Sequence, residues 1–286
     1  MKTIAFLNVK VGVGKTTSVT TVAHLLASEY GKKTLIIDTD PQANTTALFS
    51  EIDYYNRIQK KFDGELENLE YSISNLLIDK DIDIHKCISK TKYENLDIIK
   101  SDLQLTEIEN RLKADVTSPQ QFRLARHLKA IETEYDYCII DCSPSVSIVN
   151  INGLAVADEV FIPTRTDGYS IEGVAYAQSL IETVSEYNLK LKIGGVFFVA
   201  WENFNCPKVA YQVLESLVGN LLLPIRINKN KLLAENTMQQ TPLLELDRRK
   251  RTRATQSYIK LTEYILSKNR TKYIKTMESE NRKESV

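Results

Sequence analysis

The chain alternates short apolar runs with longer amphipathic stretches. The amphipathic stretches place apolar residues at i, i+3 and i+4, which is typical of a helix with one buried face. Alternating strand and helix units predict an α/β fold, with helices on both faces of a mostly parallel, twisted sheet. The apolar runs span Lys2–Asn8, Thr34–Asp38, Leu96–Lys100, Tyr137–Asp141, Glu159–Pro163, Lys192–Ala200 and Leu221–Ile225, and the amphipathic stretches span Thr16–Tyr30, Gln120–Glu134, Ser170–Tyr187 and Lys208–Gly219.

Length and composition are those of a globular protein with one large or two small domains. The 286 residues are 43% hydrophobic and 26% charged, which is enough apolar material for a sizeable core. We expect a single domain over residues 1–268, a polar excursion within it at about 50–95, and a polar, flexible tail over 269–286. No apolar run approaches the roughly 18 residues of a membrane span, and the N-terminus lacks the features of a signal peptide. The four cysteines have neither disulfide-framework nor zinc-site spacing, so we expect a cytoplasmic protein.

The strongest motif runs from Val9 to Thr17 and reads V-K-V-G-V-G-K-T-T. It lies between a predicted strand and a predicted helix, so its backbone N–H groups and the helix N-terminus would face bound phosphates. Lys15 is expected to bridge the β- and γ-phosphates, and the Thr16 hydroxyl to bind Mg²⁺. The nucleotide-binding residues predicted from this loop are Gly12, Val13, Gly14, Lys15, Thr16 and Thr17.

Two predicted strands end in carboxylates. Asp38 and Asp40 belong to the segment D-T-D-P-Q-A-N, and Asp141 ends the run that begins at Tyr137. Carboxylates at strand ends beside a phosphate loop can hold Mg²⁺ or orient the attacking water. The residues alone leave a second interpretation of the first segment open, namely a strand-ending Asp-Pro turn whose Asn44 caps the next helix. Asp141 is expected to bind Mg²⁺ through water.

The fragment that begins at Lys10, K-x-G-V-G-K-T-T, together with D-T-D-P-Q from Asp38, resembles the deviant Walker A loop and first switch of the ParA/MinD superfamily of ATPases. The likeness extends from Lys2 to about residue 265. It implies a P-loop NTPase fold and an ATP-sandwich homodimer in which Lys10 reaches the partner's nucleotide. By the same likeness, Asp40 would position the hydrolytic water and Asp38 would support the water shell of the metal. The resemblance makes Lys10, Lys15 and Asp40 the expected catalytic residues, and Thr16, Asp40 and Asp141 the expected Mg²⁺ ligands, partly through water.

Val11 departs from the family pattern, which usually has glycine at this position. A β-branched residue avoids positive φ, so Val11 would weaken nucleotide binding or hydrolysis if the loop needed glycine geometry there. Three interpretations follow: an ordinary ATPase whose loop tolerates valine, a slow ATPase, or a nucleotide-gated scaffold with little turnover.

The net charge of zero hides a strong asymmetry. Residues 248–286 carry 12 Lys and Arg against 4 Asp and Glu, a net of +8, so residues 1–247 carry a net of −8. A basic end on an acidic body favours either a contact with a polyanion or a solubilising C-terminus. ParA-like members bind DNA non-specifically through basic residues in this region. The expected DNA-binding residues are Lys229, Lys231, Arg248, Arg249, Lys250, Arg251 and Arg253.

The ParA branch of the superfamily therefore provides the main prediction, an ATPase for plasmid or DNA partition. The resemblance implies ATP or ADP and Mg²⁺ as cofactors, an ATP-dependent homodimer, non-specific double-stranded DNA, and a ParB-like DNA-bound adaptor that stimulates hydrolysis. Such a protein would be associated with the nucleoid. A MinD-like positioning ATPase is the remaining alternative. Residues 271–286 are polar on every face rather than amphipathic, so no membrane contact is expected.

Overall fold

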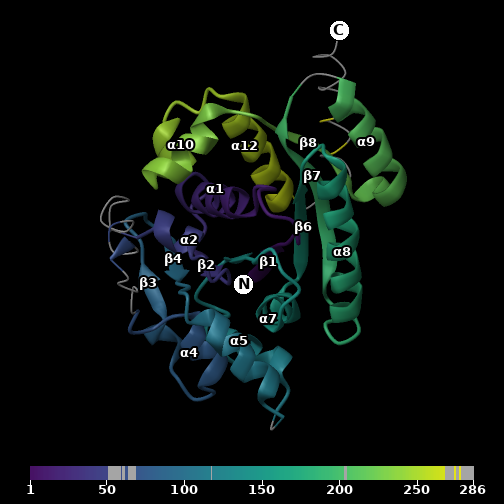
Figure 1. Cartoon of the computed structure of the whole chain (residues 1–286). Coiled ribbons are helices and arrows are strands. Elements are labelled where there is room, and N and C mark those ends of the chain that lie inside the picture. The colour runs from purple at the N-terminus through teal and green to yellow at the C-terminus, as the bar shows by residue number, and fades with distance from the viewer. Residues whose placement is uncertain are drawn as a thin grey trace.

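The protein is built around one eight-stranded sheet with the strand order β3-β4-β2-β5-β1-β6-β7-β8 (Figure 1). The computed structural model describes residues 1–50, 59, 62–63, 69–116, 118–202, 205–267, 274 and 277. Every neighbouring pair of strands is parallel except β3 and β4, which are antiparallel. The strands are β1 (Lys2–Phe6), β2 (Thr34–Asp38), β3 (Ile88–Lys90), β4 (Leu96–Ile99), β5 (Tyr137–Asp141), β6 (Glu159–Thr164), β7 (Lys192–Trp201) and β8 (Leu222–Asn228).

Helices cover both faces of this sheet, as predicted (Figure 1). Successive residues of a strand point to opposite faces, and β1 shows the consequence. Ala5 lies in a core that also contains residues of α4 to α9, whereas Ile4 and Phe6 lie in a second core with α1, α11 and α12. The helices are α1 (Lys15–Ser28), α2 (Asn44–Leu48), α4 (Ile73–Ile78), α5 (Leu105–Ala114), α6 (Arg123–Leu128), α7 (Ile148–Val156), α8 (Gly168–Ser185), α9 (Asn205–Val218), α10 (Lys231–Gln239), α11 (Leu243–Leu246) and α12 (Arg253–Leu266).

The predicted element pattern agrees with this structure at most positions. All seven predicted strands are present, and three of the four amphipathic stretches correspond to α1, α8 and α9. The prediction of one continuous helix over Gln120–Glu134 is wrong, because a 3-10 turn (Gln120–Phe122), α6 and a second 3-10 turn (Lys129–Ile131) replace it. The Asn152 side chain of α7 donates to the Gln120 carbonyl and accepts from the Leu124 N–H. It thereby gives hydrogen-bond partners to the two backbone groups that do not bond to each other at the break. The short strand β3 was not predicted.

The parallel arrangement brings three loops to one edge of the sheet. β5 lies between β1 and β2, so the residues that follow these strands meet at their carboxyl ends. Asp38 and Asp141 are register partners, and Asp141 also pairs with Phe6, which ends β1. Within the described part of the chain, no helix combines the length and the apolar character that crossing a bilayer would require.

Candidate functional site

The loop between β1 and α1 has the backbone shape that its glycines predict. Gly12 and Gly14 have φ of 76° and 72°, in the left-handed region that glycine adopts most readily. The Lys15 ammonium lies back over the loop and donates to the Lys10 carbonyl at 2.9 Å. Val11 does not adopt a positive φ, and its side chain is 81% exposed. The position of Val11 therefore does not require the backbone freedom of glycine.

Asp141 is the centre of the polar contacts at the end of β5. It is 1% exposed, and its Oδ2 accepts from the Thr16 hydroxyl at 2.8 Å and from the Thr45 hydroxyl at 2.7 Å. Its other oxygen, Oδ1, is buried and has no hydrogen-bond partner among the described residues. Burial raises the pKa of Asp141 to about 6, although the two threonine hydrogen bonds act in the opposite direction. A buried oxygen without a partner costs free energy unless a ligand or water occupies it.

Asp38 and Asp40 end β2 in two different environments. Asp38 is fully buried, and its Oδ2 accepts from both the N–H and the hydroxyl of Thr46 at 2.8 Å. Burial and the neighbouring Asp141 raise the pKa of Asp38 to about 8. Asp40 is 8% exposed and lines a cavity of about 210 Å³ that also touches Ser143. Asp38 is therefore an internal support, whereas Asp40 faces a space that a ligand can enter.

The two lysines of the loop occupy different places. Lys15 is 7% exposed, and burial lowers its pKa, while Asp141 acts in the opposite direction. Lys10 lies farther out, with its Nζ 5.5 Å from the centre of the Tyr169 ring at the start of α8. Thus Lys15 lies beside the carboxylate cluster, and Lys10 lies at the mouth of the site.

Comparison with known proteins gives the family. A family model described as an AAA domain matches residues 1–193. The sporulation initiation inhibitor protein Soj of Bacillus subtilis is 31% identical over 268 residues, which cover 92% of this chain and 98% of Soj. The chain belongs to the ParA/Soj family of partition ATPases. The chromosome partitioning protein ParA of Caulobacter vibrioides is 28% identical over 284 residues, which cover 96% of this chain and 97% of that protein.

Solved structures have the same fold as this ParA-type ATPase. The ATP complex of Cyanothece McdA(D38A) superposes with a TM-score of 0.77 at 20% identity, and it covers 94% of this chain and 98% of McdA. A putative plasmid partition protein of Borrelia burgdorferi, bound to AMPPNP, superposes with a TM-score of 0.69 at 24% identity, with 91% and 98% covered. These similarities confirm the predicted α/β fold with a mostly parallel sheet.

The predicted basic residues of this ParA-type ATPase lie on the surface around α10 and before α12. Lys229 forms an ion pair with Glu202 at 3.2 Å, and Lys250 pairs with Glu29 at the end of α1. The other five are exposed and form no ion pair with a described residue: Lys231, Arg248, Arg249, Arg251 and Arg253.

A single carboxylate shapes the arginine-rich loop before α12. Asp247 accepts from the Arg251 N–H at 3.1 Å and from the Thr252 N–H at 3.0 Å. Burial alone would raise the pKa of Asp247, but these hydrogen bonds outweigh it and lower the pKa. The carboxylate therefore stays ionised and holds the loop in a fixed turn.

Sequence reasoning missed two threonines of the site. Thr45 binds Asp141, and Thr46 binds Asp38 and also accepts from the Ser101 N–H at 2.9 Å. Both stand at the start of α2, directly after the segment that ends in Asn44. The two neighbouring hydroxyl residues are visible in the sequence, but only the approach of α2 to β5 in the folded chain shows which carboxylates they contact.

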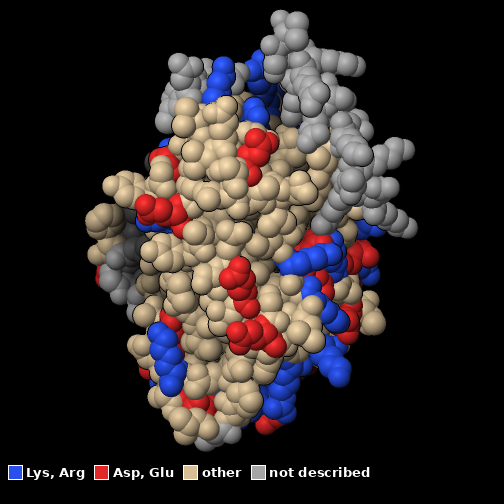
Figure 2. All heavy atoms as spheres, turned by 90° about the vertical axis from the view of Figure 1, so that its right-hand side faces the viewer, with Lys and Arg blue, Asp and Glu red and all other residues tan. Residues whose placement is uncertain are grey.

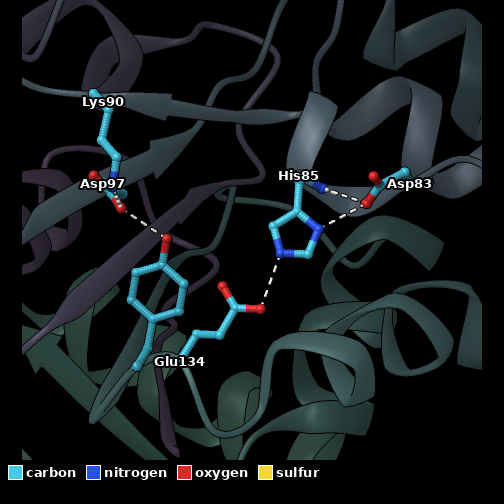
Figure 3. A network of polar contacts seen from close by, with 6 residues as sticks. Asp83, His85, Lys90, Asp97 and Glu134 are labelled. Atoms are coloured by element: carbon cyan, nitrogen blue, oxygen red, sulfur yellow. Dashed lines mark hydrogen bonds and ion pairs between the residues drawn. The ribbon is translucent and has the colours of Figure 1, made fainter.

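A second polar cluster lies at the opposite, amino edge of the sheet (Figure 3). His85 bridges Asp83 at 2.8 Å and Glu134 at 2.9 Å, and its hydrogen bonds to these carboxylates raise its pKa. Nearby, Asp97 pairs with Lys90 beside a cavity of about 650 Å³. That cavity is larger than the one at Asp40, but three lysines and three carboxylates line it and it is remote from the phosphate loop. We therefore assign it no part in the nucleotide chemistry.

Proposed function

We propose that this ParA-type ATPase binds Mg–ATP at the phosphate loop, closes into a sandwich homodimer, and binds double-stranded DNA without sequence preference. A DNA-bound, ParB-like adaptor would then stimulate hydrolysis and release the dimer, in a cycle that partitions a plasmid or other DNA in the nucleoid. The observation that carries the nucleotide step is the Asp141 carboxylate: one oxygen accepts from two threonine hydroxyls, and the other is buried with no hydrogen-bond partner among the described residues.

The residues around Asp141 fit Mg²⁺. Magnesium prefers oxygen ligands and usually binds through one or two carboxylates, several waters and the substrate phosphates. Thr16 and Asp141 supply such oxygens, directly or through water, and Asp40 would add another. When bound, the ion would neutralise charge that develops on the phosphates during transfer.

The chain's own groups would do the remaining work. Lys15, now bonded to the Lys10 carbonyl, would turn to the phosphates, since a phosphate oxygen is a stronger partner than a carbonyl. Asp40 would orient the attacking water from the side of the cavity that it lines. Asp38, held by Thr46, would keep the backbone of Asp40 in place through its contact with the Asp40 N–H at 3.1 Å.

The side chains at the opening of the site support the proposal that the protein closes against a second copy of itself. Lys10 lies there with Tyr169, which is 73% exposed, and with Val11. An ammonium group among exposed apolar side chains can be buried against a second molecule that presents a phosphate to the ammonium.

The loop that Asp247 organises supports DNA binding. It presents Arg248, Arg249 and Arg251 to solvent on a turn that two partly buried hydrogen bonds hold. Contacts of such residues with phosphates carry no sequence information and weaken as salt rises.

Val11 bears on the scaffold alternative. That hypothesis needs a loop that is strained by valine, but Val11 has neither a positive φ nor a buried side chain. We therefore favour ordinary turnover and expect Val11→Gly to change the rate of ATP hydrolysis by less than about twofold, since an exposed substitution in an unstrained region has little effect. A large increase with glycine would restore the slow-ATPase or scaffold interpretation.

Binding to random-sequence duplex DNA, measured with ATP, with ADP and without nucleotide at two salt concentrations, tests the proposal. We expect binding that requires ATP, falls with salt and is lost in Lys10→Ala. Lys33→Ala is the matched control, because Lys33 is an exposed lysine at the opposite edge of the sheet. Binding that is equally strong in all three nucleotide states would contradict the proposed switch.

A further inference from the structure

Two asparagines of α7 are completely buried and contact different parts of the molecule. Asn150 and Asn152 are both 0% exposed. Asn152 bonds to the broken helix that precedes β5, whereas Asn150 lies against the loop that follows Asp141. A buried amide without hydrogen-bond partners costs free energy, so the partners that Asn150 has chosen show what its side chain holds in place.

The Asn150 side chain uses its acceptor and its donor on one short loop. Its Oδ1 accepts from the Ser143 N–H at 3.0 Å, and its Nδ2 donates to the Ser143 carbonyl at 2.9 Å and to the Ser145 carbonyl at 2.6 Å. An amide can do this because it carries a donor and an acceptor side by side, whereas an apolar side chain has neither. The backbone just beyond Asp141 is therefore fixed to α7 by a single side chain.

The same loop is also tied to the segment that follows β2. Thr39 stands between Asp38 and Asp40. Its N–H donates to the Asp141 carbonyl at 3.0 Å, and its hydroxyl donates to the same carbonyl at 2.7 Å. The hydroxyl oxygen of Thr39 also lies 3.5 Å from the Asn150 Oδ1. The two segments that carry the three carboxylates are thus bound to each other and, through Asn150, to α7.

This loop forms one wall of the cavity beside Asp40. Ser143 and Ser145 line that cavity together with Asp40. Under the proposed function, Asp40 orients the attacking water from this cavity, so the placement of the wall that faces Asp40 affects the placement of the water. A misplacement of about 1 Å can slow a reaction about a hundredfold. No side-chain hydrogen bond of Asn150 to a described residue reaches the phosphate loop.

We propose that Asn150 is a positioning residue for ATP hydrolysis, which holds the loop after Asp141 in register with Asp40 through a link that Thr39 completes. This inference rests on the proposed function, because it concerns the hydrolytic step at the same site. Without the amide, the loop over residues 143–145 would shift away from Asp40. Asp141 would stay in place, since β5 is paired with β1 on one side and with β2 on the other. Hydrolysis therefore depends on Asn150, and nucleotide affinity does not.

Asn150→Leu and Asn152→Leu are a matched pair, because each removes a fully buried amide from the same helix. Phosphate release from Mg–ATP by the full chain gives kcat, and a fluorescent ADP analogue gives the Kd for nucleotide. We expect kcat to be at least about tenfold lower in Asn150→Leu than in Asn152→Leu, with a Kd within about threefold of the wild type in both. Both variants should lose Tm, since each leaves buried backbone groups without partners.

Thr39 offers a second pair that decides the question if Asn150→Leu does not fold. Thr39→Val removes the hydroxyl that bonds to the Asp141 carbonyl, and Thr39→Ser keeps it. We expect kcat to fall about fivefold or more in Thr39→Val and to stay within about twofold of the wild type in Thr39→Ser. All four substitutions exchange uncharged, buried residues, so the surface charges, including those on the face of α8 and α9 in Figure 2, are the same in every variant.

Three results would overturn the inference while the wild type hydrolyses ATP. They are equal kcat values in the two leucine variants, a Kd that rises as much as kcat falls, and a Thr39→Val variant that hydrolyses ATP like Thr39→Ser. A wild type that binds the ADP analogue but hydrolyses no ATP, alone or with duplex DNA, would refute the proposed function and this inference together.

Discussion

Gly173 lies in α8, and adding a single methyl group there should disturb the phosphate loop, although Gly173 is not part of that loop. A Cβ at residue 173 would lie 2.4 Å from the Asn8 Oδ1 and 2.7 Å from the Lys10 Cγ. Asn8 cannot move aside easily, because its side chain accepts from the Lys10 N–H at 2.9 Å and donates to the Pro163 carbonyl at 2.9 Å. Gly173→Ala must therefore shift α8 or displace the segment that carries Lys10.

The expected magnitude follows from two opposing effects. Forcing a methyl group into a packed contact costs about 1–3 kcal/mol, and replacing glycine by alanine within a helix returns up to about 1 kcal/mol. Gly168→Ala is the matched control, because it lies in the same helix with nothing within 4 Å of the added Cβ. We expect Gly173→Ala to be about 2 kcal/mol less stable to unfolding than Gly168→Ala.

Urea unfolding of both variants measures this difference, and ATP-dependent DNA binding measures its effect on Lys10. Gly173→Ala should weaken ATP-dependent binding, while Gly168→Ala should leave it unchanged. If the two variants are equally stable and bind DNA equally well with ATP, α8 does not hold the Lys10 segment in the way described, and the reasoning fails.

Three further predictions concern other parts of the molecule. Burial lowers the pKa of His24 to about 4 from 6.5, so as pH falls the unfolded chain takes up a proton before the folded chain does. The free energy of unfolding should therefore fall by up to about 3 kcal/mol as pH drops from 6.5 to 4. Urea unfolding should show this loss in the wild type and not in His24→Phe, and a loss of equal size in both proteins would refute the prediction. Thr45→Val removes a hydrogen bond to Asp141 and should weaken Mg–ATP binding about fivefold by calorimetry, whereas unchanged affinity would mean that the hydroxyl has no part in the site. Arg248→Ala with Arg249→Ala should weaken DNA binding at every sequence and lower the salt dependence by about two phosphate contacts, and an unchanged slope would locate the DNA elsewhere.

The candidate site was largely predictable because its main residues follow strands. Asp141 ends an apolar run, and Lys15 and Thr16 begin the helix after the loop that follows another such run. The carboxyl ends of parallel strands meet at one edge of the sheet, so these residues come together. The contacts of Thr45 and Thr46 were not predictable, since they depend on how α2 returns to β5 and β2. The role of Val11 was also undecidable from sequence, because it turns on one backbone dihedral that neighbouring residues set.

The broken helix before α7 illustrates the same limit. The apolar period of Gln120–Glu134 predicts one continuous helix, and a local pattern gives no reason to doubt it. The interruption depends on Asn152, about 30 residues later, whose side chain occupies the backbone groups at the break. A distant side chain can thus override a local periodicity when it supplies the hydrogen bonds that the helix would otherwise make.

The amino-acid sequence by itself determined seven of the eight strands, the main helices, the phosphate loop and the carboxylates around it. These follow from local periodicity and from motifs whose residues are neighbours in the chain. Only the tertiary structure decided the rest: the Asp141 oxygen that has no hydrogen-bond partner among the described residues, the supports of Asp38 and the close packing of α8 on Lys10. The reason is physical, since burial, unpaired charge and close contact belong to pairs of residues far apart in sequence, and only the folded chain brings them together.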